Sequence, residues 1–262
     1  MKADLMTATQ ASKLNRSEIP ASFPLQAYIP MDHSRQVTAE HCLRHLLATN
    51  PDIRRVMDLG CGPGNSIDFF REKIEEVNWV GLDIESSPEV MQRTRKDAEF
   101  RTFDGVHIPF DSDSFDLVYS RQVFEHVRRP AELLREVRRV LRPMCLFVGS
   151  TSHLEPYHSH SFWNYTPLGF YELLDEAGFD LVEMRPGIDG LTLLVRRALG
   201  CPKAFDRFFR NESPLNLMIE LASRIAGKNC GWSNATKLLF SGHFCFLAVK
   251  RESQGANSER LV

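Results

Sequence analysis

The chain has 262 residues, of which 43% are hydrophobic and 25% charged, so it can bury a sizeable core and is not expected to be disordered. A formal net charge of -2 gives no electrostatic basis for binding nucleic acid. The six cysteines form no Cys-x-x-Cys pair, the N-terminus lacks the apolar core of a signal peptide, and no apolar run approaches the ~18 residues of a membrane span. We therefore expect reduced thiols, a cytoplasmic location and no transmembrane segment.

The first half of the chain predicts alternating helices and strands. Residues 1–33 are polar and interrupted by prolines, which is typical of a loose N-terminal arm, and a helix is expected over 33–47. Helices are also expected at 66–76 and at 129–141, where Pro130 suits the first turn. Short apolar runs predict strands at 54–60, 78–84, 98–103, 114–120 and 145–150. This alternation predicts an α/β fold with a mostly parallel sheet that helices cover on both faces.

The second half predicts a helix at 166–178, a strand at 180–186 and a last strand at 242–251. About 55 residues, 187–241, separate these two strands. Within that insertion, 215–226 predicts a helix with a wide apolar face, which Ser213 can cap, Pro214 can open and Gly227 can close.

The stretch VMDLGCGPGNS, residues 56–66, places Gly60, Gly62 and Gly64 at a strand-to-helix turn. Glycine permits positive φ and lets a ligand approach the backbone, and the next helix presents its positive end to an anionic group. The dinucleotide fingerprint GxGxxG needs a glycine where Asn65 stands, so a pyrophosphate site is disfavoured.

Several motifs in register resemble the class I S-adenosylmethionine-dependent methyltransferases, in particular the methyltransferase type 11-like group. They are VMDLGCGPG, VGLDI, DGVHIPFDSDSFDLVYSRQVFEHV and LREVRRVLRPMCLFVGS, and together they lie within residues 50–185. One departure is Met144-Cys145, where the family usually has two glycines. The resemblance implies a Rossmann-like fold, with a seven-stranded, mostly parallel sheet and an antiparallel last strand, and S-adenosylmethionine as cofactor.

The resemblance also implies a cofactor site. Asp83 would accept hydrogen bonds from the ribose hydroxyls, and Asp104 would meet the adenine amino group. The other implied cofactor-binding residues are Asp58, Gly60, Cys61, Gly62, Gly64, Ile84, Gly105, Ser120 and Gln122.

Structural explanations remain open for several of these residues. Asp58 could cap the turn, Asp83 could be a plain strand-end acid, Asp104-Gly105 could be an ordinary turn, and Cys61 could be a small filling residue.

An oxygen acceptor would need a base, most often histidine, and His126 with its neighbour Glu125 is the candidate. The alternative is that these two residues make only local bonds. Three more histidines (153, 158, 160) follow the strand at 145–150, but their spacing matches no metal motif, so no metal is expected. The arginines of 128–142 alternate with glutamates, which favours a solvated helix face over an RNA-binding patch.

We interpret the whole chain as one methyltransferase domain, with an arm (1–33), a cofactor-binding core (34–186 and 242–251) and the insertion (187–241). We expect O-methylation of a glycan or small hydroxylated metabolite, with the insertion as one wall of the acceptor pocket and its apolar face turned inward. Alternatives are a catalytically silent cofactor-binding partner subunit, a methyltransferase acting on a lipid-like acceptor, and, least favoured, an NAD-linked oxidoreductase. The insertion could instead pack on the core or contact a membrane surface.

Overall fold

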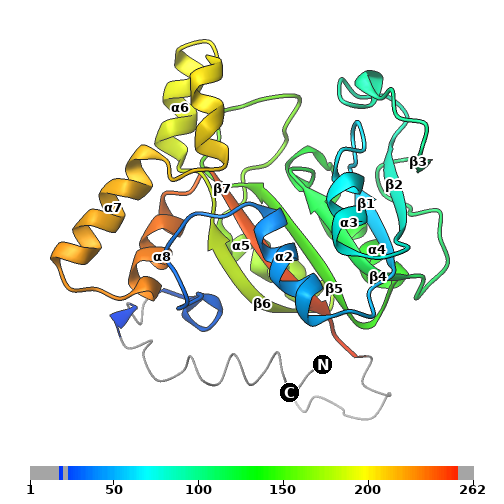
Figure 1. Cartoon of the computed structure of the whole chain (residues 1–262), viewed down its shortest axis with the longest axis horizontal. Helices are drawn as coiled ribbons and strands as arrows, with labels where there is room; N and C mark the ends of the chain where they lie inside the picture. Colours follow the sequence, from blue (N-terminus) through cyan, green and yellow to red (C-terminus); the bar gives the residue numbers. More distant parts are fainter. Residues whose placement is uncertain (1–17, 20–22, 253–262) are drawn as a thin grey trace.

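The computed structural model describes residues 18, 19 and 23–252, and its centre is a seven-stranded sheet (Figure 1). The strand order is β3-β2-β1-β4-β5-β7-β6. Strands β1 to β5 pair in parallel, whereas β7 is antiparallel to both β5 and β6. The strands are β1 (Arg55–Leu59), β2 (Asn78–Ile84), β3 (Glu99–Phe103), β4 (Phe115–Arg121), β5 (Leu141–Ser152), β6 (Phe179–Pro186) and β7 (His243–Lys250). The predicted fold class is confirmed.

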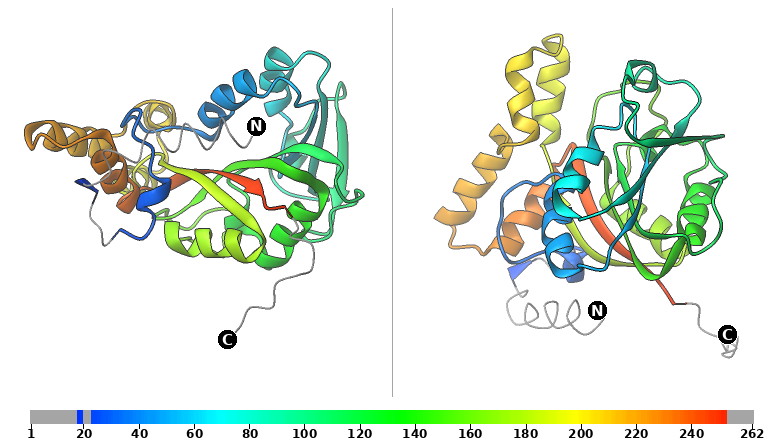
Figure 2. Two further views of the ribbon diagram at one scale, coloured as in Figure 1. Left: turned by 90° about the horizontal axis from the view of Figure 1, so that it is seen from below. Right: turned by 45° about the vertical axis from the view of Figure 1, so that its right-hand side comes forward.

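Helices cover both faces of the sheet, as Figure 2 shows. α2 (Ala39–Thr49) and α3 (Ser66–Lys73) share one apolar cluster with one face, and α4 (Pro130–Val140) and α5 (Pro167–Glu176) share another with the opposite face. Their formation follows from the sequence: Pro130 opens α4, and Thr166 Oγ1 caps α5 by accepting a hydrogen bond from the Gly169 N–H at 3.0 Å. Because both faces are covered, β4 is buried from Phe115 to Ser120.

Strand β5 begins at Leu141, directly after α4, and so is longer than its predicted core at 145–150. The register with β4 shifts between the pairs Phe115–Leu141 and Leu117–Leu146. Met144 lies in this irregular part with φ +63°, a left-handed conformation that favours glycine. This is where the resembling family has glycine, so the backbone keeps the turn although the residue type differs.

The N-terminal segment is not a loose arm where it is described. Leu25 and Ile29 are buried in the main apolar cluster. Asn234 of α8 (Cys230–Leu239) donates hydrogen bonds to the carbonyls of Pro30 (2.9 Å) and His33 (2.8 Å). Apolar packing and buried hydrogen bonds therefore hold residues 23–33 in place, and the rest of the expected arm, 1–17 and 20–22, lies outside the described residues.

The insertion contains three helices, α6 (Gly190–Ala198), α7 (Pro214–Ile225) and α8, with the 3-10 helix η5 (Lys203–Phe209) between α6 and α7. The sequence predicted α7 alone. Asp189 is the sequence signal that could have indicated α6, since its carboxylate caps the helix by accepting from the Thr192 N–H at 2.6 Å. In Figure 1, α6 and α7 lie beyond the β6–β7 end of the sheet, far from β3. None of the described helices is both long and apolar enough to cross a membrane.

The sequence predicted that the apolar face of the insertion turns inward, and this prediction is wrong for α6 and α7. α7 buries Asn216 and Ser223 and exposes Met218 and Leu221. The sequence could not show this orientation, because the polar side chains of α7 find buried partners from a distant part of the chain.

Gln36, in the segment before α2, connects to the η5–α7 part of the insertion. Its Oε1 accepts from Ser213 N (2.8 Å), Ser213 Oγ (2.9 Å) and Asn216 Nδ2 (2.8 Å). Its Nε2 donates to the Phe208 carbonyl at 2.7 Å. These groups are buried or half-buried, so they depend on one another for their hydrogen bonds.

Gln36→Leu should lower the free energy of unfolding by about 2–4 kcal/mol, because it leaves several buried donors and one carbonyl without partners. Limited proteolysis should then cut first within 187–241. The control is Gln92→Leu at an exposed position in η3 (Val90–Gln92), and chemical denaturation measures both. Equal stability of the two variants would contradict the connecting role of Gln36.

Candidate active site

The loop after β1 is held in a conformation that only glycine adopts easily. Gly60, Gly62 and Gly64 have φ values of +71°, +50° and +82°. A Cβ at Gly60 would lie 2.2 Å from a Val123 methyl carbon, and one at Gly64 would lie 2.6 Å from the Phe100 ring. The loop therefore packs tightly between neighbouring segments and leads directly into α3, whose first N–H groups lack helical partners and favour an anion.

Asp58, on β1 before the loop, connects to the helix after it. It is 4% exposed on β1, and its carboxylate accepts a hydrogen bond from the hydroxyl of Ser66, the first residue of α3. Burial raises the pKa of Asp58 to about 7, despite the Ser66 bond. The contacts of Asp58 are thus those of a residue that positions the turn, and its contact with a cofactor remains a prediction.

Cys61 is a buried thiol within the loop. Burial raises its pKa well above the ordinary value, with the charges of Asp58 and Asp83 adding to the effect. A thiol with a raised pKa is a poor nucleophile, so this environment supports the filling role.

Asp83 ends β2 beside the glycine loop. Its Oδ2 accepts from the Gly62 N–H at 2.7 Å, and its Oδ1 accepts from the Ile84 N–H at 2.8 Å. The side chain is half-buried, and this burial raises its pKa although both bonds favour the charged form. Each carboxylate oxygen keeps a further lone pair, so Asp83 can accept two more hydrogen bonds from a ligand.

Arg93 also holds the loop, and the sequence motifs did not indicate it. Its Nε donates to the Gly62 carbonyl at 2.8 Å, and its guanidinium lies 4.1 Å from the centre of the Phe100 ring. Arg93 comes ten residues after Asp83 in an irregular stretch, so only the folded chain brings them to one loop.

Ile84, next to Asp83, exposes an apolar side chain that lies close to Gly105. Ile84 is 42% exposed at the end of β2, and a Cβ at Gly105 would lie 3.8 Å from its Cγ2. Asp104 is already used locally: Oδ1 accepts from the backbone of Val106 and His107, and Oδ2 pairs with His107 Nδ1 at 2.6 Å. The structure thus shows the turn interpretation of Asp104, while its adenine contact remains a prediction.

The carboxyl end of β4 carries Ser120 and Gln122. Ser120 is fully buried, and its hydroxyl has no hydrogen-bond partner among the described residues. When the Gln122 amide is oriented so that its oxygen accepts from Ser150 Oγ (3.1 Å), its nitrogen donates to Glu125 Oε1 at 2.9 Å. Gln122 therefore connects β4 to the next turn, η4 (Phe124–His126).

Glu125 is a fully buried carboxyl group in η4. It accepts from Thr151 Oγ1 at 2.9 Å and from Ser152 Oγ at 3.3 Å. Burial raises its pKa to about 7. Its contacts are those of a positioning residue.

His126 is only half-buried, and its buried Nδ1 has no partner among the described residues. Its ring meets the ring of His158 edge to face, with centroids 5.1 Å apart. Burial lowers the pKa of His126, so the imidazole is neutral at pH 7.

A second carboxylate, Glu155, shares the Ser152 hydroxyl with Glu125 as a hydrogen-bond partner. Ser152 Oγ donates to Glu155, and His243 Nε2 lies 2.8 Å from Glu155 Oε2. Burial works to raise the pKa of Glu155, but the bond to His243 and its charge outweigh burial and lower it. The sequence missed Glu155 and His243, although His243 lies opposite Ser152 in the β5–β7 pairing.

Glu125, His126 and His158 each place one candidate metal-ligating atom within 4.8 Å of the other two. The sequence predicted no metal site. Both oxygens of Glu125 already accept hydroxyl bonds, so its carboxylate has a structural explanation without a metal.

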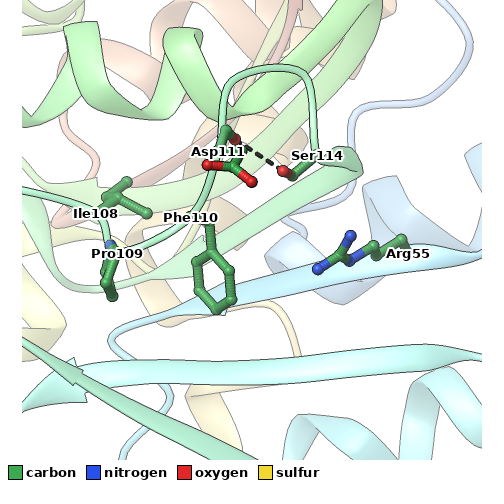
Figure 3. A pocket seen from close by; sticks show the side chains of 6 residues that line it. All are labelled: Arg55, Ile108, Pro109, Phe110, Asp111 and Ser114. Carbon is green, nitrogen blue, oxygen red and sulfur yellow. Dashed lines mark hydrogen bonds between the residues drawn. The ribbon is translucent and has the colours of Figure 1, made fainter.

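Figure 3 shows a pocket of about 390 Å³, lined by Arg55, Ile108, Pro109, Phe110, Asp111 and Ser114. Arg55 begins β1 and Ser114 precedes β4, so this pocket lies at the amino edge of the sheet. The glycine loop and Asp83 lie at the carboxyl edge, where α/β sheets bind ligands, and we take that edge as the candidate site.

Comparison with known proteins agrees with this geometry. Residues 57–149 match the family described as a methyltransferase domain. The matched segment is therefore a methyltransferase domain. A Mycolicibacterium smegmatis protein named as an S-adenosylmethionine-dependent methyltransferase is 31% identical over 140 residues, or 49% of this chain and 52% of that protein.

Two further proteins are similar to this methyltransferase domain. The phthiotriol/phenolphthiotriol dimycocerosates methyltransferase of Mycobacterium tuberculosis is 29% identical over 124 residues, covering 44% of this chain and 45% of the relative. Phosphoethanolamine N-methyltransferase 2 of Haemonchus contortus, solved with phosphomonomethylethanolamine and S-adenosylhomocysteine, has a TM-score of 0.51 at 17% identity and covers 81% of this chain and 53% of its own. That structure shows the shared fold. The chain spans about half the length of the curated relatives it matches.

The residues at the carboxyl edge fit S-adenosylmethionine. The glycine loop leads directly into a helix N-terminus, Asp83 has acceptor capacity left, and Ile84 offers an exposed apolar surface. The unpartnered Ser120 hydroxyl is a buried polar group at the same edge.

The stability of the Glu125→Gln variant should fall less than that of wild type as the pH rises from acidic to alkaline. The folded-state pKa of Glu125, about 7, lies above its ordinary 4.5, so the folded state retains a proton that the unfolded state loses. Wild-type stability should therefore fall as pH rises from about 4.5 to 7, and the variant should lack that loss, on the order of 1–3 kcal/mol. Thermal melting at pH 5 and pH 8 measures this difference, with the exposed Glu75→Gln as control. Parallel pH profiles for wild type and Glu125→Gln would refute the raised pKa of Glu125.

Proposed function

We propose that the protein transfers a methyl group from S-adenosylmethionine to an oxygen of a glycan or another small hydroxylated metabolite. The observation that carries the proposal is the junction of Gly62 and Asp83, where a glycine loop and a strand-end carboxylate meet at 2.7 Å. The buried polar cluster of Glu125, Ser152 and Glu155 follows β4 and β5, on the same edge of the sheet.

The cofactor contacts are proposed residue by residue. Asp83 accepts from the ribose hydroxyls, and Ile84 and Gly105 flank the adenine, with Asp104 near its amino group. The backbone of Gly60 and Gly62 and the start of α3 receive the methionine portion, whose carboxylate suits a helix N-terminus.

When bound, S-adenosylmethionine supplies an activated methyl group on a sulfonium. An acceptor hydroxyl that took up this methyl group would lose its proton, so the chain would have to hold a base beside the acceptor oxygen. His126 suits that base because it is neutral at pH 7 and has an unpartnered Nδ1. Glu155 suits it less, because its lowered pKa and its bond to His243 keep it ionised and occupied.

The insertion supplies one wall of the acceptor site in this proposal. Phe209 of η5 lies with its ring centroid 6.0 Å from that of His243, which places one insertion residue beside the Glu155–His243 pair. A lipid-like acceptor is the second candidate. The name of the Mycobacterium tuberculosis relative supports it, as do the exposed apolar side chains of α6 and α7.

Asp83→Asn should weaken S-adenosylmethionine binding by on the order of 2–4 kcal/mol, because two charge-assisted bonds to ribose are lost. The melting temperature without ligand should fall modestly, because the amide nitrogen cannot accept from a backbone N–H as the carboxylate oxygen does. Calorimetric titration of S-adenosylmethionine and of NAD into wild type, Asp83→Asn and the exposed control Asp52→Asn measures this. Tight NAD binding without a response to S-adenosylmethionine would overturn the proposed cofactor site.

His126→Ala should lower methyl transfer by roughly 10²-fold while leaving cofactor affinity near wild type, since it removes a base and not a cofactor contact. The measurement is transfer of labelled methyl from S-adenosylmethionine into metabolite extracts, followed by mass spectrometry of the labelled product. His45→Ala, an exposed histidine on α2, is the control. Full activity of His126→Ala would leave positioning alone as the mechanism, and cofactor binding without transfer to any extract would indicate a silent partner subunit.

A further inference from the structure

Helix α7 exposes most of its large apolar side chains and buries two polar residues, with Ile219 as the one large apolar side chain that is buried. Its fully or nearly buried positions include Asn216 and Ser223, whereas the exposed fractions of Met218, Leu221 and Ile225 are 67%, 60% and 80%. A surface helix of a monomer normally turns its apolar stripe inward. These exposed residues are spaced three or four positions apart, so they lie on one continuous face of the helix.

Helix α6 continues this feature at the same end of the molecule, where it contacts α7. Leu191, Leu194 and Val195 are 55%, 54% and 41% exposed, while Thr192 and Leu193 of the same helix are buried. Figure 1 shows both helices outside the sheet, beyond β6 and β7. Two consecutive helices that both expose apolar faces indicate a docking surface.

The charges around these faces are mostly positive. Residues 190–228 contain seven Lys or Arg and three Asp or Glu. Two of the acids lie close to buried Lys237, Glu212 at 3.3 Å and Glu220 at 3.4 Å, and Glu220 also pairs with Arg224 at 3.1 Å. The third, Asp206, pairs with Arg196 at 2.9 Å.

Most of the cations remain at the surface. Those at exposed positions are Arg197, Lys203, Arg207, Arg210, Arg224 and Lys228. Long basic side chains beside an apolar face can bury their carbon chains and keep their charge at a lipid headgroup.

We propose that the face of α6 and α7 docks on the surface of an anionic lipid membrane. Charge decides between occupants: a second copy of this chain would bring like charges together, whereas anionic headgroups complement them. The apolar side chains, Met218 and Ile225 among them, enter the headgroup boundary, and the flanking arginines and lysines meet the lipid charges. This docking is independent of the proposed acceptor and of the proposed base.

The test is co-sedimentation of the full chain with vesicles of phosphatidylcholine alone and of phosphatidylcholine mixed with phosphatidylserine. Binding to the mixed vesicles should be tighter by roughly 10-fold or more, and it should weaken as salt is added. Met218→Glu and Leu221→Glu should each lower that binding by at least about 10-fold, because each puts a charge where an apolar side chain enters the membrane. Met91→Glu is the matched control, since Met91 is an exposed methionine (80%) on η3, away from the insertion.

A charge variant tests the electrostatic part. Arg224→Glu should weaken binding to the mixed vesicles and leave weak binding to neutral vesicles unchanged, whereas Arg101→Glu on β3 should change neither. The apolar positions are exposed, so thermal melting of Met218→Glu and Leu221→Glu should match wild type. Arg224→Glu and Arg101→Glu each lose one ion pair, with Glu220 and Glu99, so their melting temperatures should match each other.

Three results would overturn the proposal. They are no binding to either vesicle, equal binding by wild type and Met218→Glu, and equal binding to neutral and anionic vesicles. A wild-type dimer that Met218→Glu converts to a monomer, without vesicle binding, would assign the face to self-association instead.

Discussion

The hydrogen bond from the Gly62 N–H to Asp83 Oδ2 is the contact on which the candidate site depends. It joins the turn after β1 to the end of β2, and Arg93 completes the same junction through the Gly62 carbonyl. Only a glycine loop could come this close, because a Cβ at Gly60 or Gly64 would overlap neighbouring side chains. Tight packing and these hydrogen bonds therefore fix the conformation of the loop between β1 and α3.

The acceptor side is organised by a contrast between two carboxyl groups. Glu125 is fully buried, and its pKa is raised, whereas Glu155 is balanced by His243, and its pKa is lowered. The hydroxyl of Ser152 lies between them and reaches both. Two environments that shift the pKa values of two carboxyl groups in opposite directions allow one fold to keep one group protonated and the other charged. His126 lies beside Glu125, and burial lowers the pKa of its imidazole.

The insertion shows how buried polar contacts can determine the orientation of a helix. Gln36 and Lys237 supply buried partners for Asn216 and Glu220, so the polar side of α7 turns inward. The apolar side is then left outside, beside a positively charged surface. The same polar contacts that attach the insertion to the core therefore create the face that we assign to lipid.

The sequence alone determined the strands and helices of the core, the glycine turn and the position of Asp83, because these depend on local periodicity and on backbone needs. It also indicated the cofactor class, since the motif spacing reflects the order of parallel strands whose ends must meet. Tertiary structure decided what pairs across distant segments: Glu155 with His243, Arg93 with the glycine loop, and Gln36 with α7. Side-chain partners far apart in sequence leave no periodic signal, and the orientation of α7 depends on such partners, so the outward apolar face could be seen only in the folded chain.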